Sequence, residues 1–160
     1  IGSGMPTGRF CFEGFLSVNK QSRKKHLEEL KDERRTMIFY EAPHKLMATL
    51  KDFAIFFGEE RKITLCRELT KIHEEIYRTT FTEAIARYEE NPPRGEFVIV
   101  IEGKKAEDLA SEKEAIWKTM SVSDHIEMYI NDGMTEKDAL KAVAKDRGVS
   151  KRDIYNEYKV

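Results

Sequence analysis

One stretch of five apolar residues sets the strongest limit on what this chain can fold into. Residues 97–101, Phe-Val-Ile-Val-Ile, carry no polar side chain. Successive side chains of a strand point to opposite faces of its sheet, so a strand of this composition has both faces covered. We therefore expect residues 97–101 to form an inner strand with packing on each side.

Strand and helix signals alternate before this run. Short segments rich in β-formers predict further strands at 9–15, 36–40, 63–66 and 75–81. Apolar residues recur at helical spacing between Pro43 and Gly58, which predicts an amphipathic helix. Segments 23–30 and 82–88 predict shorter helices. The order strand, helix, strand, helix, strand, strand, helix, strand predicts an α/β fold with a mixed β-sheet flanked by helices.

The strand signal ends near Gly103. Three later segments open with Ser121, Thr135 and Ser150, each followed three residues on by aspartate. Such residues cap the free N–H groups of a helix's first turn. We therefore expect an α/β lobe at 1–103 and an all-helical C-terminal extension at 104–160. Trp117 is expected in the core of that extension.

Composition excludes several functional classes. Lysine and arginine number 28 against 29 aspartates and glutamates, so any contact with nucleic acid must be local. No apolar run approaches the roughly 18 residues that cross a bilayer, and no segment resembles a signal peptide, so we expect a cytoplasmic protein without membrane contact. Cys11 and Cys66 lack zinc-site spacing and are expected to be buried, reduced thiols. The histidines are scattered, so we expect no metal site.

Two segments near the start of the chain invite comparison with known phosphate-binding patterns. Residues 1–8 are glycine-rich but lack the spacing of a nucleotide-binding loop, and we expect a linker there. Four cations with no acid among them then follow the first strand, and cations at this density contact phosphates by charge. An ordinary solvated helix face would have a similar composition, so both readings stay open. The four are Lys20, Arg23, Lys24 and Lys25.

Polar side chains also follow two predicted strands. Glu41 and His44 stand where a strand runs into a helix, and in open α/β sheets ligands bind at such strand ends. Alternatively, Glu41 caps the helix and His44 is a surface residue. Residues 66–71, Cys-Arg-Glu-Leu-Thr-Lys, follow another strand. Ion pairs within the chain would explain them equally well.

The final two helices, at 135–147 and 150–158, have the length pattern of a helix-turn-helix. Residues 121–160 contain seven cations and eight acids. A reader of duplex DNA is usually more basic, so a packing appendage is the favoured interpretation.

Four motifs, taken in order, resemble a known family. They are Arg-Phe at 9–10 with Glu-Gly-Phe-Leu at 13–16, Ile-Phe-Tyr-Glu-Ala-Pro-His-Lys-Leu at 38–46, Arg-Glu-Leu-Thr-Lys at 67–71, and Pro-Arg-Gly-Glu-Phe-Val-Ile-Val-Ile-Glu-Gly at 93–103. Together they are similar to the ribosomal RNA small subunit methyltransferase I family of the tetrapyrrole methylase superfamily. The resemblance covers nearly the whole chain, including residues 141–152.

The resemblance implies methyl transfer from S-adenosylmethionine to the ribose 2'-hydroxyl of a cytidine in small-subunit ribosomal RNA. Family proteins have two α/β lobes with the cofactor between them and are expected to act as homodimers on that RNA or the assembled subunit. The chain resembles the second lobe alone and is expected to be inactive without the first. Alternatives are a corrin or porphyrin methyltransferase lobe and a helix-turn-helix nucleic-acid-binding module. The basic run and the C-terminal helices favour RNA.

The resemblance also assigns site residues. It implies cofactor contacts from Tyr40, Ala42, Pro43, His44, Arg67 and Thr70, and from Ile99 through the backbone of its strand. A base near the ribose hydroxyl would help the transfer, and the candidates are Glu41, Glu68 and Lys71. RNA backbone contacts would come from Lys20, Arg23, Lys24 and Lys25.

Overall fold

The computed structural model describes residues 2–159, without the side chain of Lys113. The chain divides into two compact units, residues 1–105 and 106–160. The elements of the first unit are β1 (Phe10–Gly14), α1 (Lys20–Leu30), β2 (Thr36–Glu41), α2 (Pro43–Phe57), β3 (Lys62–Arg67), β4 (Glu75–Thr80), α3 (Phe81–Glu90) and β5 (Phe97–Ile101). The order of strands and helices predicted from the sequence is confirmed.

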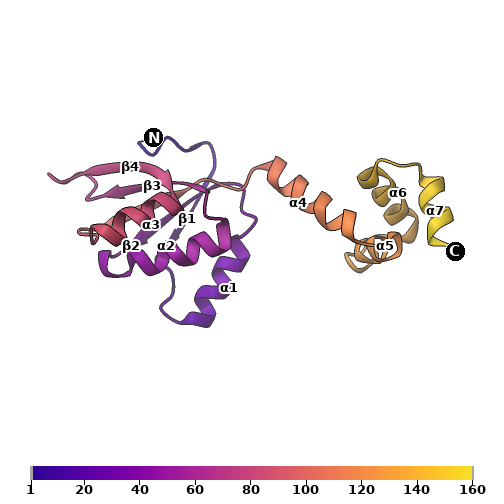
Figure 1. Cartoon of the computed structure of the whole chain (residues 1–160), viewed down its shortest axis with the longest axis horizontal. Coiled ribbons are helices and arrows are strands. Elements are labelled where there is room, and N and C mark those ends of the chain that lie inside the picture. Colours follow the sequence, from indigo (N-terminus) through magenta and orange to yellow (C-terminus); the bar gives the residue numbers. More distant parts are fainter. Residues whose placement is uncertain (1, 160) are drawn as a thin grey trace. The chain divides into compact units, whose positions relative to one another are not determined.

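The five strands form one mixed sheet in the order β1-β2-β5-β3-β4, with helices α1 to α3 on one side (Figure 1). β1 and β2 are parallel, and the remaining neighbours are antiparallel. β5 lies in the middle, as its composition predicts. Phe97, Ile99 and Ile101 point toward the helices and are at most 2% exposed, while Val100 is buried on the opposite face.

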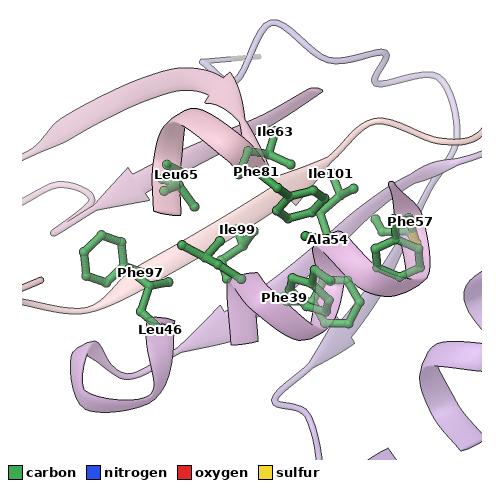
Figure 2. Packing of buried hydrophobic residues seen from close by; sticks show 14 of the residues in the cluster. Phe39, Leu46, Ala54, Phe57, Ile63, Leu65, Phe81, Phe97, Ile99 and Ile101 are labelled. Carbon is green, nitrogen blue, oxygen red and sulfur yellow. The ribbon is translucent and has the colours of Figure 1, made fainter. Parts of the chain in front are cut away.

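The main core lies between the sheet and α2 with α3 (Figure 2). The ring of Phe53 stands at its centre, with centroids 4.7 Å from Phe39 and 6.0 Å from Phe81. Full burial of a side chain of this size stabilises a fold by about 1.5–3 kcal/mol. Pro43 occupies the first turn of α2 and Gly58 ends it at φ +94°, as the sequence predicts.

Residues 2–7 lie across the sheet face opposite the helices rather than forming a free linker. The Thr36 hydroxyl donates to the Pro6 carbonyl at 2.7 Å, and the Thr64 hydroxyl donates to the Ser3 carbonyl at 2.9 Å. Arg78 donates to the carbonyls of Gly2 and Ser3. This segment supplies the second cover over the middle strands. Together with the strands it lines an open pocket of about 310 Å³.

The two cysteines differ in burial. Cys66, on the inner strand β3, is buried as expected. Cys11 is only half-buried, because β1 is an edge strand. Its thiol lies 3.7 Å from the Thr36 carbonyl.

The second unit consists of α4 (Ala106–Thr119), α5 (Val122–Asn131), α6 (Glu136–Arg147) and α7 (Lys151–Tyr158). The three predicted caps are confirmed, since the Ser121, Thr135 and Ser150 side chains each accept from the backbone N–H three residues on. The sequence did not predict α4. Trp117 is only half-buried and lies outside the apolar core, which corrects the expectation for it. That core consists of Val122, Ile126, Ala139, Leu140, Val143, Ala144 and Ile154.

Candidate functional site

The register of the sheet brings the predicted strand-end residues to one edge. Glu41, at the end of β2, and Arg67, at the end of β3, both pair with Phe97 at the start of β5. β2 and β3 are therefore each one strand away from β5, and neighbouring strands lie about 4.8 Å apart. The segments that follow, residue 42 and the loop at 68–74, leave the sheet at the same edge. We call this the strand-end edge.

Glu41 faces the helices and not the solvent. It is 4% exposed, and both of its carboxylate oxygens accept hydrogen bonds. One accepts from the Ala42 backbone N–H at 2.9 Å and the other from the Thr49 hydroxyl at 2.6 Å. Glu41 thus stabilises the start of α2, whose N-cap Ala42 has no capping side chain. This geometry favours the capping alternative over the expected role as a base.

Arg23 extends the same buried network. Its guanidinium donates to the Thr49 hydroxyl oxygen at 2.8 Å and to Asp52 at 2.6 Å. The side chain is 16% exposed. The chain of contacts from Glu41 through Thr49 and Arg23 to Asp52 joins β2, α2 and α1. Two of the nitrogen donors of Arg23 are therefore engaged within the chain, and its expected contact with RNA stays a prediction.

The loop after β3 is held by its own polar groups. Glu68 and Thr70 adopt φ values of +49° and +65°, which are uncommon for residues other than glycine. The Glu68 carboxylate accepts from the Glu96 backbone N–H at 2.7 Å. Lys71 donates to Glu68 at 3.3 Å and to Glu96 at 3.0 Å. Gly95 lies so close that a Cβ there would be 2.6 Å from Glu68 Cγ.

These bonds set the charges of the loop. The hydrogen bond from Glu96 and the contact with Lys71 lower the pKa of Glu68. The bonds to Glu96 and Glu68 raise the pKa of Lys71. Lys71 is therefore an ammonium group at neutral pH and has no free electron pair with which to take a proton. Glu68 is ionised, but a lowered pKa makes a carboxylate a weaker base.

Arg67 pairs with Glu75 on the neighbouring strand. Its Nε lies 3.2 Å from Glu75 Oε2 without the geometry of a hydrogen bond. Glu75 also accepts from Arg87, whose guanidinium lies 4.3 Å from the centre of the Tyr77 ring. The side chain of Arg67 is 30% exposed, so part of it faces solvent at the strand-end edge.

The remaining predicted cofactor contacts separate into accessible and buried ones. Tyr40 is 42% exposed, and its ring packs against Phe12 and Phe15 at centroid distances of 5.0 and 5.6 Å. His44 and Thr70 are exposed, while Ala42 and Pro43 are half-exposed. Ile99 is fully buried, and its backbone pairs with β2 on one side and β3 on the other. Its side chain is therefore covered by the core, and the expected cofactor contact through its backbone stays a prediction.

Two of the other predicted cations line a groove between α1 and α2. It has a volume of about 690 Å³ and is lined by Lys20, Lys24 and also Lys45. Within the described residues, these three ammonium groups have no ion-pair partner. Lys25 does not line the groove and lies 3.9 Å from Glu29. Lys45 was missed because it is 20 positions beyond the basic run, in the first turn of another helix.

The helical unit holds a separate buried cluster around His125. The imidazole is fully buried between the rings of Trp117 and Tyr129, at centroid distances of 5.1 and 5.5 Å. Its Nδ1 accepts from Arg147 Nε at 3.2 Å, whereas Nε2 has no hydrogen-bond partner in the described structure. Burial and the nearby Arg147 lower the pKa of His125. Arg147 also donates to the carbonyls of Trp117, Met120 and Ser121. The cluster therefore joins α4, α5 and α6.

Among residues 2–159, without the side chain of Lys113, no group of three or more His, Cys, Asp or Glu side chains is arranged to hold a metal ion. Across the described helices, none has the length and apolar character needed to span a membrane.

Curated relatives match the chain over nearly all of its length. It is 44% identical over 160 residues to ribosomal RNA small subunit methyltransferase I of Bacillus subtilis (strain 168), covering 100% of this chain and 54% of that protein. The protein of that name from Halalkalibacterium halodurans is 45% identical over 158 residues, covering 99% and 54%. The one from Escherichia coli O157:H7 is 34% identical over 155 residues, covering 96% and 51%.

Two solved structures show a weaker likeness. The methyltransferase CobJ has a TM-score of 0.49 and 21% identity over 64% of this chain and 44% of its own. The cobalt precorrin-4 methyltransferase CbiF has a TM-score of 0.45 and 16% identity over 57% and 40%. Both scores are below 0.5, so the assignment rests on the sequence relatives. No protein-family model matches the chain.

The fold and the relatives together define the class, an α/β segment of the methyltransferases. More narrowly, the chain is similar over nearly its whole length to ribosomal RNA small subunit methyltransferase I. It spans about half the length of the curated relatives it matches.

Proposed function

We propose that this chain is the second lobe of an S-adenosylmethionine-dependent methyltransferase acting on small-subunit ribosomal RNA. The observation that carries the proposal is the 44% identity to the Bacillus subtilis relative over all 160 residues. In this role residues 1–103 form the α/β lobe and residues 104–160 the helical extension. The names of the relatives favour RNA over a corrin or porphyrin as substrate.

The finer part of the proposal concerns the acceptor and the assembly. The methyl group goes to the ribose 2'-hydroxyl of a cytidine, in the RNA or in the assembled small subunit. The protein acts in the cytoplasm, where ribosomal subunits are present, and as a homodimer. The chain alone lacks the first lobe of the site and does not transfer methyl groups by itself.

The strand-end edge has features that fit the cofactor. S-adenosylmethionine carries an aromatic adenine, hydroxyls and an amino acid, and it supplies a methyl group activated by a cationic sulfur. The exposed ring of Tyr40 offers a flat apolar surface suited to an aromatic ligand. The half-exposed residues Ala42 and Pro43 offer apolar contacts, and the exposed residue Thr70 carries a hydroxyl for a polar contact. Arg67 and His44 complete the proposed cofactor-binding set.

The three residues considered as bases have positioning roles in this proposal. Glu41 fixes the start of α2 through Ala42 and Thr49. Glu68 and Lys71 fix the loop after β3 against Glu96. Holding the reacting groups in one geometry accelerates a transfer without any proton being moved by these residues.

Calorimetry with S-adenosylhomocysteine tests the proposal. The chain would replace the matching segment of the Bacillus subtilis relative, and both this chimera and the isolated chain would be titrated. We expect saturable binding by the chimera only. Tyr40→Ala should weaken binding by about tenfold, as expected for loss of one aromatic stacking contact. Tyr155→Ala removes a tyrosine of similar exposure on α7 and should leave binding unchanged. A folded chimera that binds no S-adenosylhomocysteine would contradict the proposal.

A further inference from the structure

The groove between α1 and α2 has a charge that the cofactor proposal does not use. Lys20 and Lys24 lie one turn apart on α1, and Lys45 reaches the groove from the first turn of α2. Side chains one turn apart have Cβ atoms about 5–6 Å from each other. Their ammonium groups can therefore approach a single anionic group. With Lys45 opposite, the groove presents cations from both walls.

The groove has little negative charge to offset these lysines. Asp52 is the one carboxylate among its described lining residues, and Arg23 holds it at 2.6 Å. Arg23 and Asp52 thus neutralise each other at the groove wall. Three unpaired ammonium groups remain, and a cleft with one sign of charge concentrates ions of the other sign.

Apolar side chains also line the groove. Val18 is 79% exposed, Ala48 is exposed on α2, and Phe56 is half-buried. The volume of about 690 Å³ lies in the range of about 300–1,000 Å³ that is usual for small-ligand sites. These apolar lining residues, which we call the groove floor, and the lysines beside them match a ligand with a flat apolar part and an anionic part.

We propose that this groove binds a nucleotide of single-stranded RNA. The phosphates lie against Lys20, Lys24 and Lys45, and the base rests on the groove floor beside Ala48. The inference rests on the proposed function, in which the RNA belongs to the ribosomal substrate. A base must be unstacked to enter the groove, and unstacked bases occur in single-stranded loops and ends rather than in regular duplexes.

Fluorescence anisotropy with the whole chain tests the phosphate contacts. The probe is a fluorescein-labelled, single-stranded 12-nucleotide RNA of mixed sequence, titrated between 50 and 200 mM salt. With three phosphate contacts on a single strand, the logarithm of the binding constant falls with the logarithm of the salt concentration at a slope of about 2. Binding should therefore weaken about 20-fold between 50 and 200 mM salt. K20A/K24A/K45A should remove this salt dependence. The matched control K31A/K62A/K105A also removes three exposed lysines of the first unit, all outside the groove lining. Equal salt dependence in the two triple variants would overturn the inference.

A second pair of variants tests the base contact. Ala48→Trp fills the groove floor and leaves its charges unchanged, whereas Ala86→Trp makes the same change at an exposed position on α3. We expect Ala48→Trp to weaken binding of the 12-nucleotide RNA by at least about fivefold, which corresponds to the weakest stacking contacts between a base and a side chain. It should leave an abasic strand of equal length unaffected. Unchanged affinity for the RNA with bases would overturn base binding in the groove.

The two proposals fail in different ways. If the groove variants bind RNA normally while the chimera still binds S-adenosylhomocysteine, the groove inference is wrong and the methyltransferase proposal stands. If the chimera binds no S-adenosylhomocysteine, the methyltransferase proposal fails even if the lysines bind RNA. Stronger binding of a 12-base-pair RNA duplex than of the single strand would show that the groove reads a helix backbone and would overturn the nucleotide assignment.

Discussion

Replacing Thr49 with valine tests the buried network that links the strand-end edge to α1. The Thr49 hydroxyl donates to Glu41 at 2.6 Å and accepts from Arg23 at 2.8 Å. Valine keeps the shape of the side chain and removes both bonds. Thr49 is 1% exposed and Glu41 is 4% exposed, so water has little access to replace the lost contact with the carboxylate.

The size of the effect follows from these two bonds. A hydrogen bond to a charged group contributes about 1.5–3 kcal/mol. Glu41 keeps its bond from Ala42, and Arg23 keeps Asp52, so the lower value applies to each loss. We expect Thr49→Val to reduce the free energy of unfolding of the first unit by about 3 kcal/mol. With a urea dependence of about 1.5–2 kcal/mol/M, the midpoint should fall by about 1.5–2 M.

Urea unfolding with two probes measures this change and contains its own control. Trp117 is the chain's single tryptophan and lies in the helical unit, so its fluorescence should not respond to the substitution. Far-ultraviolet circular dichroism includes the first unit and should show the earlier transition. Thr82→Val removes an exposed hydroxyl on α3 that donates to Glu60 and should change stability by at most about 0.5 kcal/mol. A loss below about 1 kcal/mol for Thr49→Val would refute the network as a source of stability.

Three further predictions concern other parts of the chain. Gly95→Ala should destabilise the first unit more than Gly14→Ala in urea unfolding, because both have positive φ but only Gly95 faces a contact of 2.6 Å with Glu68; equal losses would contradict the close approach. The pKa of His125 is lower in the folded chain than in the unfolded chain, so His125 binds a proton more readily when the chain is unfolded. The helical unit should therefore lose stability as pH falls from about 6.5 toward the pKa of His125 in the folded chain. Trp117 fluorescence should show this loss, and His125→Gln should remove it; an unchanged pH dependence would exclude His125 as the cause. In the chimera, Glu68→Gln should keep methyl transfer within about threefold, since an amide oxygen still accepts from Glu96, and a 100-fold loss would instead indicate a base.

Much of the fold could be predicted because each signal is local. The run at 97–101 specifies an inner strand through its own side chains. Pro43 and Gly58 mark the two ends of α2 by their backbone preferences. α4 escaped prediction because its sequence has helix-forming residues but lacks a capping serine or threonine and a clear apolar stripe.

The candidate site was predictable in position but less so in role. Strand order and register bring the segments after β2 and β3 to one edge, as their sequence pattern indicates. The direction of the Glu41 carboxylate depends on Thr49, eight positions away on α2. The availability of Arg23 depends on Asp52, which lies 29 positions beyond it. Contacts across such separations leave no periodic or motif signal in a single sequence.

The same reason explains Lys45 and the start of the chain. Lys45 joins Lys20 and Lys24 only after α1 and α2 have packed. The segment at 2–7 has the composition of a linker, yet Thr36, Thr64 and Arg78 bind its carbonyl groups. Backbone acceptors of this kind are present in every segment, so sequence cannot show which of them will be bound.

Methyl transfer by the chimera tests the central proposal most directly. The chimera, its parent relative and the isolated chain would each be incubated with radiolabelled S-adenosylmethionine and small ribosomal subunits from a strain lacking the relative. The recovered ribosomal RNA would then be digested to nucleosides and analysed by mass spectrometry. We expect label in 2'-O-methylcytidine from the chimera and the parent, and none from the isolated chain. A folded chimera that leaves the RNA unmethylated, beside an active parent, would contradict the assignment of this chain as a lobe of that enzyme.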